Sequence, residues 1–131
     1  MHIHKAILAV DDDLDIVSII KLSLRRYGFN VFAFTDPFLA LEHFKLNLND
    51  YDLVLSDVRM PGMTGFEFIV KVREMQPNIK VLLMSAFEIN DSGFSKALPR
   101  NTKINGYVQK PVSPKELIKI IEKCLDEGEK H

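Results

Sequence analysis

Several features are scarce in this 131-residue sequence, and each scarcity excludes a class of protein. A single cysteine, Cys124, excludes an internal disulfide and suits a reducing compartment. No apolar run approaches the roughly 18 residues of a membrane span, and the N-terminus lacks a signal-peptide pattern. The net charge is only −1, so no global field favours nucleic acid or an anionic membrane. We therefore expect a cytoplasmic protein that binds neither nucleic acid nor membrane directly.

The sequence also lacks internal repeats, low-complexity tracts and linkers that would divide it into separate domains. Its residues are 47% hydrophobic and 27% charged, and a chain of this length can bury one real core. We expect a single domain over residues 1–131, with its core at about residues 3–126.

Short apolar runs alternate with helical patterns along the chain. The runs that predict strands cover residues 3–10, 30–34, 52–56, 79–84 and 104–109. This alternation indicates an α/β fold, a doubly wound five-stranded parallel sheet with helices on both faces. The natural strand order is the flavodoxin-like 2-1-3-4-5.

Capping patterns predict where several helices begin. Asp36 precedes a proline, Thr64 and Glu67 have capping-box spacing, and Ser113 also precedes a proline. The segment before the fifth strand is weaker, because the helical spacing around Phe94 extends over barely a turn before a proline. We expect a short or irregular helix there.

In the expected strand order the first and third strands are neighbours, so their carboxyl ends bring acidic residues together. Asp11 and Asp12 follow the first strand, and Asp57 follows the third. Three carboxylates at close range repel one another unless a cation joins them. Hard oxygen ligands beside a phosphate suit Mg²⁺, for which Mn²⁺ can substitute. We therefore expect a divalent cation at these acids and a phosphoryl group on Asp57.

Two more polar residues end the remaining strands. Ser85 follows the fourth strand and offers a hydroxyl to a phosphoryl oxygen, and Lys110 follows the fifth and offers a compact cation. The bond from Lys110 to Pro111 is a candidate for the cis form. Taken singly, such residues are more often helix caps, turn residues or solvated charges. Because all of these residues lie at strand ends, a common site for a phosphoryl group and a cation is favoured over those separate roles.

Four stretches, residues 7–13, 56–65, 84–86 and 106–111, resemble the receiver domain of response regulators in two-component signalling. The resemblance covers nearly the whole chain and implies a chemotaxis-regulator-like, flavodoxin-like fold. It also implies phosphorylation of Asp57 by a sensor histidine kinase or phosphotransfer protein, followed by slow autodephosphorylation. The phosphoryl group would switch a surface that binds an unidentified downstream protein, and phosphorylation-dependent homodimerisation stays open. The resemblance implies no enzyme activity beyond weak self-phosphorylation and self-dephosphorylation.

The same resemblance implies a metal site. It assigns Mg²⁺ ligation to Asp12, to Asp57 and to the backbone carbonyl of Arg59, with Asp11 acting through water.

The resemblance also implies a conformational switch that responds to phosphorylation. Ser85 and Tyr107 match the pair that rearranges on phosphorylation, and Lys110 matches the phosphate contact. Arg59 and Phe87 occupy the positions that tune the lifetime of the phosphoryl group. No output domain follows the last predicted helix, so we expect a stand-alone receiver or the receiver portion of a longer protein.

Two alternatives come from other classes. The Asp11-x-Asp13 pattern after an apolar strand suggests a phosphatase of the haloacid-dehalogenase type with Asp11 as nucleophile, although this leaves the match around Asp57 unexplained. A receiver-like interaction module that never carries phosphate is the other alternative, and the presence of every expected site residue disfavours it.

Overall fold

The computed structural model describes residues 4–86 and 102–127. The strands are β1 (Ala6–Val10), β2 (Asn30–Phe34), β3 (Leu53–Asp57), β4 (Lys80–Ser85) and β5 (Gly106–Gln109). The helices are α1 (Leu14–Tyr27), α2 (Pro37–Leu46), α3 (Gly65–Met75) and α5 (Pro114–Asp126). The expected short helix around Phe94, and Phe87 with it, lie outside the described residues.

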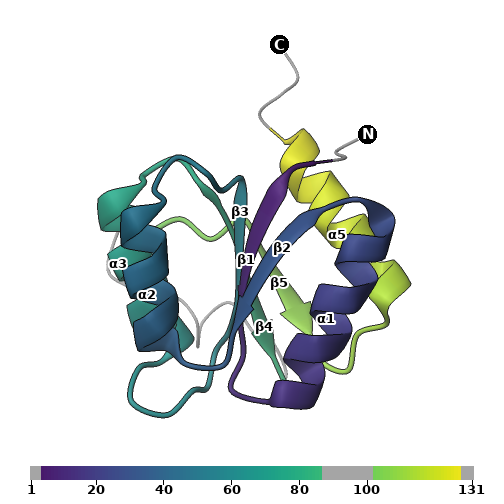
Figure 1. Cartoon of the computed structure of the whole chain (residues 1–131), viewed down its shortest axis with the longest axis horizontal. Coiled ribbons are helices and arrows are strands. Elements are labelled where there is room, and N and C mark those ends of the chain that lie inside the picture. The colour runs from purple at the N-terminus through teal and green to yellow at the C-terminus, as the bar shows by residue number, and fades with distance from the viewer. Residues whose placement is uncertain (1–3, 87–101, 128–131) are drawn as a thin grey trace.

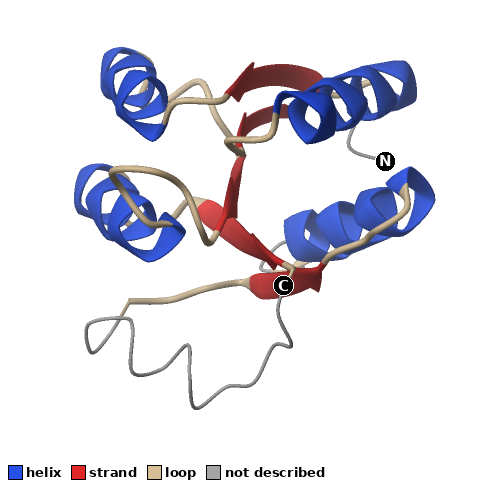
Figure 2. Ribbon diagram, turned by 90° about the horizontal axis from the view of Figure 1, so that it is seen from below, coloured by secondary structure: helices blue, strands red, loops and turns tan. Residues whose placement is uncertain are grey.

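All strand pairs are parallel, and the sheet has the order β2-β1-β3-β4-β5 (Figure 1). The predicted fold class and strand order are therefore confirmed. Figure 2 shows the sheet edge-on, with α1 and α5 on one face and α2 and α3 on the other. The loops that follow β1, β3 and β5 lie at the lower edge of Figure 1, and this edge carries the candidate site.

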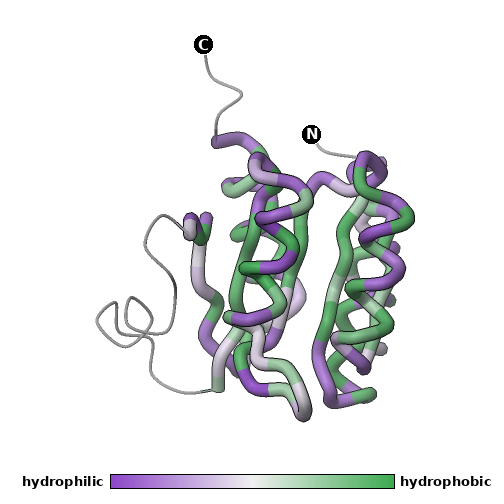
Figure 3. The backbone as a smooth tube through the Cα atoms, turned by 90° about the vertical axis from the view of Figure 1, so that its left-hand side faces the viewer, coloured by the Kyte–Doolittle hydropathy of each residue, from purple (hydrophilic) through white to green (hydrophobic). Residues whose placement is uncertain are grey.

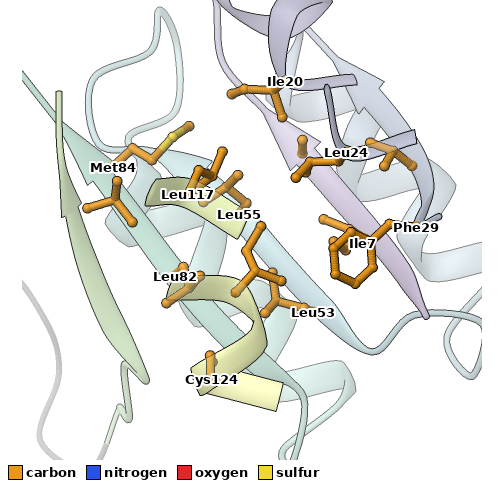
Figure 4. Close-up of a cluster of buried hydrophobic side chains, with 14 of the residues drawn as sticks. Ile7, Ile20, Leu24, Phe29, Leu53, Leu55, Leu82, Met84, Leu117 and Cys124 are labelled. Atoms are coloured by element: carbon orange, nitrogen blue, oxygen red, sulfur yellow. The ribbon is translucent and has the colours of Figure 1, made fainter. Parts of the chain in front are cut away.

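The sheet separates two apolar cores, and alternate residues of its central strands enter one or the other. Ile7 and Leu55 pack toward α1 and α5, whereas Leu8 and Val54 pack toward α2 and α3. Figure 4 shows the α1/α5-side cluster. Because both faces are covered, the central strands are almost continuously apolar, and they are mostly green in Figure 3.

Of the five strands only β2 has the predicted bounds, and at two of the differing strand starts a side-chain hydrogen bond gives the reason. The side chain of Asp52 accepts a hydrogen bond from the backbone N–H of Ala6 at 2.8 Å, so Asp52 caps the start of the sheet and β3 begins at Leu53. The side-chain oxygen of Asn105 accepts from the backbone N–H of Val81 at 2.8 Å, and β5 begins after it. At its other end β3 includes Asp57, which pairs with Met84 of β4.

The predicted helix starts are confirmed. The side chains of Asp36, Thr64 and Ser113 each accept a backbone N–H from the first turn of the helix that follows. Thr64 and Glu67 form the complete capping box. No helix within residues 4–86 and 102–127 combines the length and the apolar character needed to cross a bilayer.

Cys124 of α5 is 3% exposed in the α1/α5-side core, and burial raises the pKa of its thiol to about 11. At pH 8 only about a thousandth of the thiol is then thiolate, the reactive form. We expect a native thiol titration with an aromatic disulfide to be at least about a hundredfold slower than the same titration in denaturant. A Cys124→Ser variant gives the background. A native rate equal to that of a free thiol would contradict this packing.

Candidate phosphoacceptor site

The ends of β1 and β3 bring three acids together. Asp57 ends β3, and Asp11 and Asp12 directly follow β1, whose Val10 pairs with Ser56. One carboxylate oxygen from each acid lies within 4.8 Å of the other two. The convergence expected from the strand order is therefore present.

The acidic residues that follow β1 have different structural roles. Asp13 is the N-cap of α1, and its side chain accepts from the backbone N–H groups of Asp15 at 2.9 Å and Ile16 at 3.3 Å. Asp11 is 1% exposed and accepts the N–H of Asp13 at 3.0 Å, whereas Asp12 is exposed. Helix capping thus accounts for Asp13 but not for the position of Asp11 and Asp12 beside Asp57.

Lys110 joins the two buried acids. Its Nζ lies 2.7 Å from Oδ2 of Asp11 and 2.9 Å from Oδ1 of Asp57. Its backbone N–H donates to the carbonyl of Ser85 at 2.7 Å, and the peptide bond to Pro111, a candidate for the cis form from the sequence, is cis. The sequence suggested Lys110 as a phosphate contact, but it gave no signal for this bridge between two carboxylates.

Burial and the neighbouring charges have opposing effects on the pKa values of Asp57 and Lys110. Burial raises the pKa of Asp57, the neighbouring Asp11 and Asp12 raise it further, and the ammonium group of Lys110 opposes these effects. Burial lowers the pKa of Lys110, but its hydrogen bonds to Asp11 and Asp57 outweigh this, so its pKa is raised and the ammonium is retained. Lys110 therefore stays charged beside the acids.

The donor set fits a divalent metal ion. Three carboxylates and one ammonium carry a formal charge of −2, which a divalent cation balances. Mg²⁺ takes one or two carboxylates and keeps several waters, and the exposed position of Asp12 leaves an open side for them. Oxygen-only ligands also favour Mg²⁺ or Mn²⁺ over softer metals.

The other predicted residues lie around this centre. Ser85 ends β4 and is buried, one residue after Met84, which pairs with Asp57. Tyr107 is half-buried on the edge strand β5, against the α2/α3-side core. Arg59 is exposed in the loop that follows β3, two residues beyond Asp57. Ser85 and Arg59 thus lie at the carboxyl ends of strands neighbouring or carrying the acids, whereas Tyr107 lies within β5, three residues before Lys110.

The loop from β3 to α3 depends on two glycines. Gly62 has a φ of 80°, a left-handed conformation that favours glycine. Gly65 packs so closely that an added Cβ would lie 2.1 Å from the carbonyl oxygen of Asp57 and 2.9 Å from the Cα of Val58. Sequence reasoning used Gly65 only as part of a motif and missed this contact, which seats α3 directly against the acceptor residue.

A doubly wound parallel sheet with acids at the switch point between β1 and β3 defines the flavodoxin-like class of ligand-binding α/β proteins. Within that class, the sequence identifies one family. The sequence model for the response regulator receiver domain matches residues 7–122, and the chain belongs to this family.

Similar proteins agree with this assignment. The alkaline phosphatase synthesis transcriptional regulatory protein PhoP of Bacillus subtilis is 32% identical over 114 residues, which are 87% of this chain and 45% of PhoP. The chain thus spans less than half the length of this curated relative.

Two solved structures show the same fold. A CheY-like response regulator receiver domain protein from Methanospirillum hungatei is 31% identical with a TM-score of 0.83, covering 97% of this chain and 98% of that one. The response regulator TrrA from Thermotoga maritima, solved in complex with Mg²⁺ and BeF, is 30% identical with a TM-score of 0.74, covering 92% and 98%.

Proposed function

We propose that this receiver domain is a phosphoacceptor in which Asp57 takes a phosphoryl group in a Mg²⁺-dependent reaction. The observation that carries the proposal is the meeting of Asp11, Asp12 and Lys110 at the buried carboxylate of Asp57. A buried nucleophile with a cation on one side and metal-binding acids on the other suits phosphoryl transfer, where catalysis is mainly positioning and charge stabilisation.

The donor is a sensor histidine kinase or a phosphotransfer protein. A carboxylate oxygen of Asp57 forms a bond to phosphorus, and the bond from phosphorus to the histidine nitrogen of the donor breaks with its electron pair on nitrogen. Lys110 already contacts Asp57 and exchanges that ion pair for the phosphoryl oxygens. Asp12 and Asp57 would hold a divalent cation that offsets the charge of those oxygens.

Asp12, Asp57 and the backbone carbonyl of Arg59 are the proposed Mg²⁺ ligands, with Asp11 acting through water. The exposed position of Asp12 and the burial of Asp11 beside Lys110 support this division. Mn²⁺ can replace Mg²⁺ at such a site.

The phosphoryl group adds roughly −1.5 to −2 charge and three acceptor oxygens, and the proposed response starts at Ser85. Its hydroxyl turns to the phosphoryl group, and Tyr107 moves inward, which alters the surface presented to a downstream protein or to a second copy. Arg59 and Phe87 set how slowly water removes the phosphoryl group. The proposal places these events in the cytoplasm and involves no direct binding of nucleic acid or membrane.

The phosphatase alternative needs both acids of the Asp11-x-Asp13 pattern in the site. The side chain of Asp13 is engaged as the N-cap of α1, which argues against the phosphatase alternative.

Incubation with Mg²⁺ and acetyl phosphate followed by intact mass spectrometry tests the proposal. The wild type should gain one phosphoryl group and Asp57→Asn none, whereas steady turnover of acetyl phosphate that requires Asp11 but not Asp57 would favour the phosphatase.

Asp12→Ala should weaken Mg²⁺ binding by about tenfold or more, because it removes an exposed carboxylate from the ligand cluster. Mg²⁺ raises the unfolding temperature of the wild type by mass action, and the variant should need correspondingly more Mg²⁺ for the same shift. Asp15→Ala is the matched control, since Asp15 is an exposed acid of α1 outside the cluster. Identical Mg²⁺ titrations for wild type and Asp12→Ala would contradict the assigned ligand.

A further inference from the structure

Helix α2 is apolar on nearly every side. Only three of its ten residues are polar, and these are Glu42, His43 and Lys45. The helix packs against β1, β2 and α3, and the residues that it buries are Pro37, Ala40 and Phe44. A surface helix ordinarily carries polar residues on its outer side, whereas a helix that is apolar all round is usually covered. The outer side of α2 is therefore suited to a partner.

Leu39, Glu42 and Leu46 form a stripe along that outer side, which we call the α2 stripe. Their spacing of three and four residues puts them on one face of the helix. Leu39 is 60% exposed and Leu46 is 82% exposed. Two half-exposed aromatic residues extend the apolar surface: Phe38 precedes the stripe in α2, and the ring of Phe32 stacks on a ring of α2. Figure 1 shows α2 along the outside of the molecule.

The charges beside the stripe are complementary to their own reverse order. Glu42 and Lys45 are both exposed, and neither forms an ion pair within residues 4–86 and 102–127. A second α2 helix turned end for end brings its Lys45 within reach of Glu42, and the same rotation brings its Leu46 over Leu39. Each of these contacts then occurs twice, as in any interface with twofold symmetry.

We propose that the α2 stripe is a dimer interface, at which two copies of this chain place their α2 helices antiparallel about a twofold axis. A partner of one charge sign would match only Glu42 or only Lys45, whereas a second copy matches both. The inference does not depend on the proposed phosphoacceptor function. Because α2 packs on β1, β2 and α3, away from β4 and β5, the association needs no phosphoryl group.

The dimer should be weak, since a pair of ten-residue helices lies at the low end of specific interfaces, near or below about 1,200 Å² of buried surface. Sedimentation equilibrium of the unphosphorylated wild type should show monomer at about 10 μM and mainly dimer at about 1 mM. A chain that stays monomeric at the higher concentration would overturn the inference.

Leu46→Glu should keep the chain monomeric at the higher concentration, because it places a carboxylate against Leu39 of the other copy. The exposure of Leu46 means that the variant should fold, which circular dichroism checks. Leu22→Glu is the matched control, since Leu22 is 54% exposed on α1 and lies outside the stripe. Its dimer should equal that of the wild type, and equal disruption by the two variants would overturn the inference.

A charge exchange tests the antiparallel orientation. Glu42→Lys and Lys45→Glu each put like charges across the axis twice, so each should weaken the dimer by about tenfold. The double variant restores opposite charges and should associate within about threefold of the wild type. A double variant no stronger than either single variant would contradict the proposed pairing.

Cross-linking tests which residues face each other. Leu39→Cys alone and Leu46→Cys alone should not form disulfide dimers on oxidation, because equal positions lie about 10 Å apart along the antiparallel pair. A mixture of the two variants should cross-link, since position 39 of one copy faces position 46 of the other. Cross-linking of either variant alone as fast as the mixture would overturn the inference.

Discussion

Lys110→Met should lower the rate of Asp57 phosphorylation by about a hundredfold or more. Loss of one preorganised donor to developing charge typically costs this much. The variant also leaves Asp11 and Asp57 buried without their shared ammonium group, which raises the pKa of Asp57 and weakens the fold in the absence of metal. The rate is measured by intact mass after mixing with Mg²⁺ and acetyl phosphate.

Lys115→Met is the matched control, because Lys115 is an exposed lysine in the first turn of α5, a few residues from Lys110. Its phosphorylation rate should equal that of the wild type. Lys110→Arg retains the charge but not the compact ammonium group and should restore little of the rate. If Lys110→Met and Lys115→Met were phosphorylated equally fast, Lys110 would have no part in the chemistry.

Gly65→Ala should reduce the free energy of unfolding by about 3 kcal/mol or more. The new methyl group would collide with backbone atoms of Asp57 and Val58, and neither can move without displacing the end of β3. Chemical denaturation measures the loss. The same displacement should slow phosphorylation of Asp57, because it moves the nucleophile relative to Lys110.

Gly106→Ala controls for the effect of adding a methyl group at a glycine. Among residues 4–86 and 102–127, its Cβ would meet only Cδ2 of Leu82, at 2.9 Å, and that side chain can change rotamer. We expect a loss of about 1 kcal/mol. Similar losses for the two variants would mean that the contact of Gly65 with the acceptor strand carries no special cost.

The order of the strands and the convergence of the acids were predictable because both follow from local patterns. Alternating strands and helices allow few topologies, and the order 2-1-3-4-5 makes β1 and β3 neighbours. That order places Asp11 and Asp12 beside Asp57 without any knowledge of side-chain positions. The caps at Thr64 and Ser113 were predictable for the same reason, since capping depends on residues within one turn.

Contacts between distant residues were not predictable. The bridge from Lys110 to Asp11 and Asp57 joins residues that lie far apart in the chain, and a lysine at the end of a strand carries no sign of its partners. The close approach of Gly65 to Asp57 depends on how α3 seats against β3.

The most direct test of the account identifies which carboxylate carries the phosphoryl group. After phosphorylation with Mg²⁺ and acetyl phosphate, reduction with borohydride converts an aspartyl phosphate to homoserine, which peptide mass spectrometry can locate. We predict homoserine at position 57 and unmodified aspartate at positions 11 and 12. Homoserine at position 11 or 12, or no homoserine in a phosphorylated sample, would contradict the assignment of Asp57 as the acceptor.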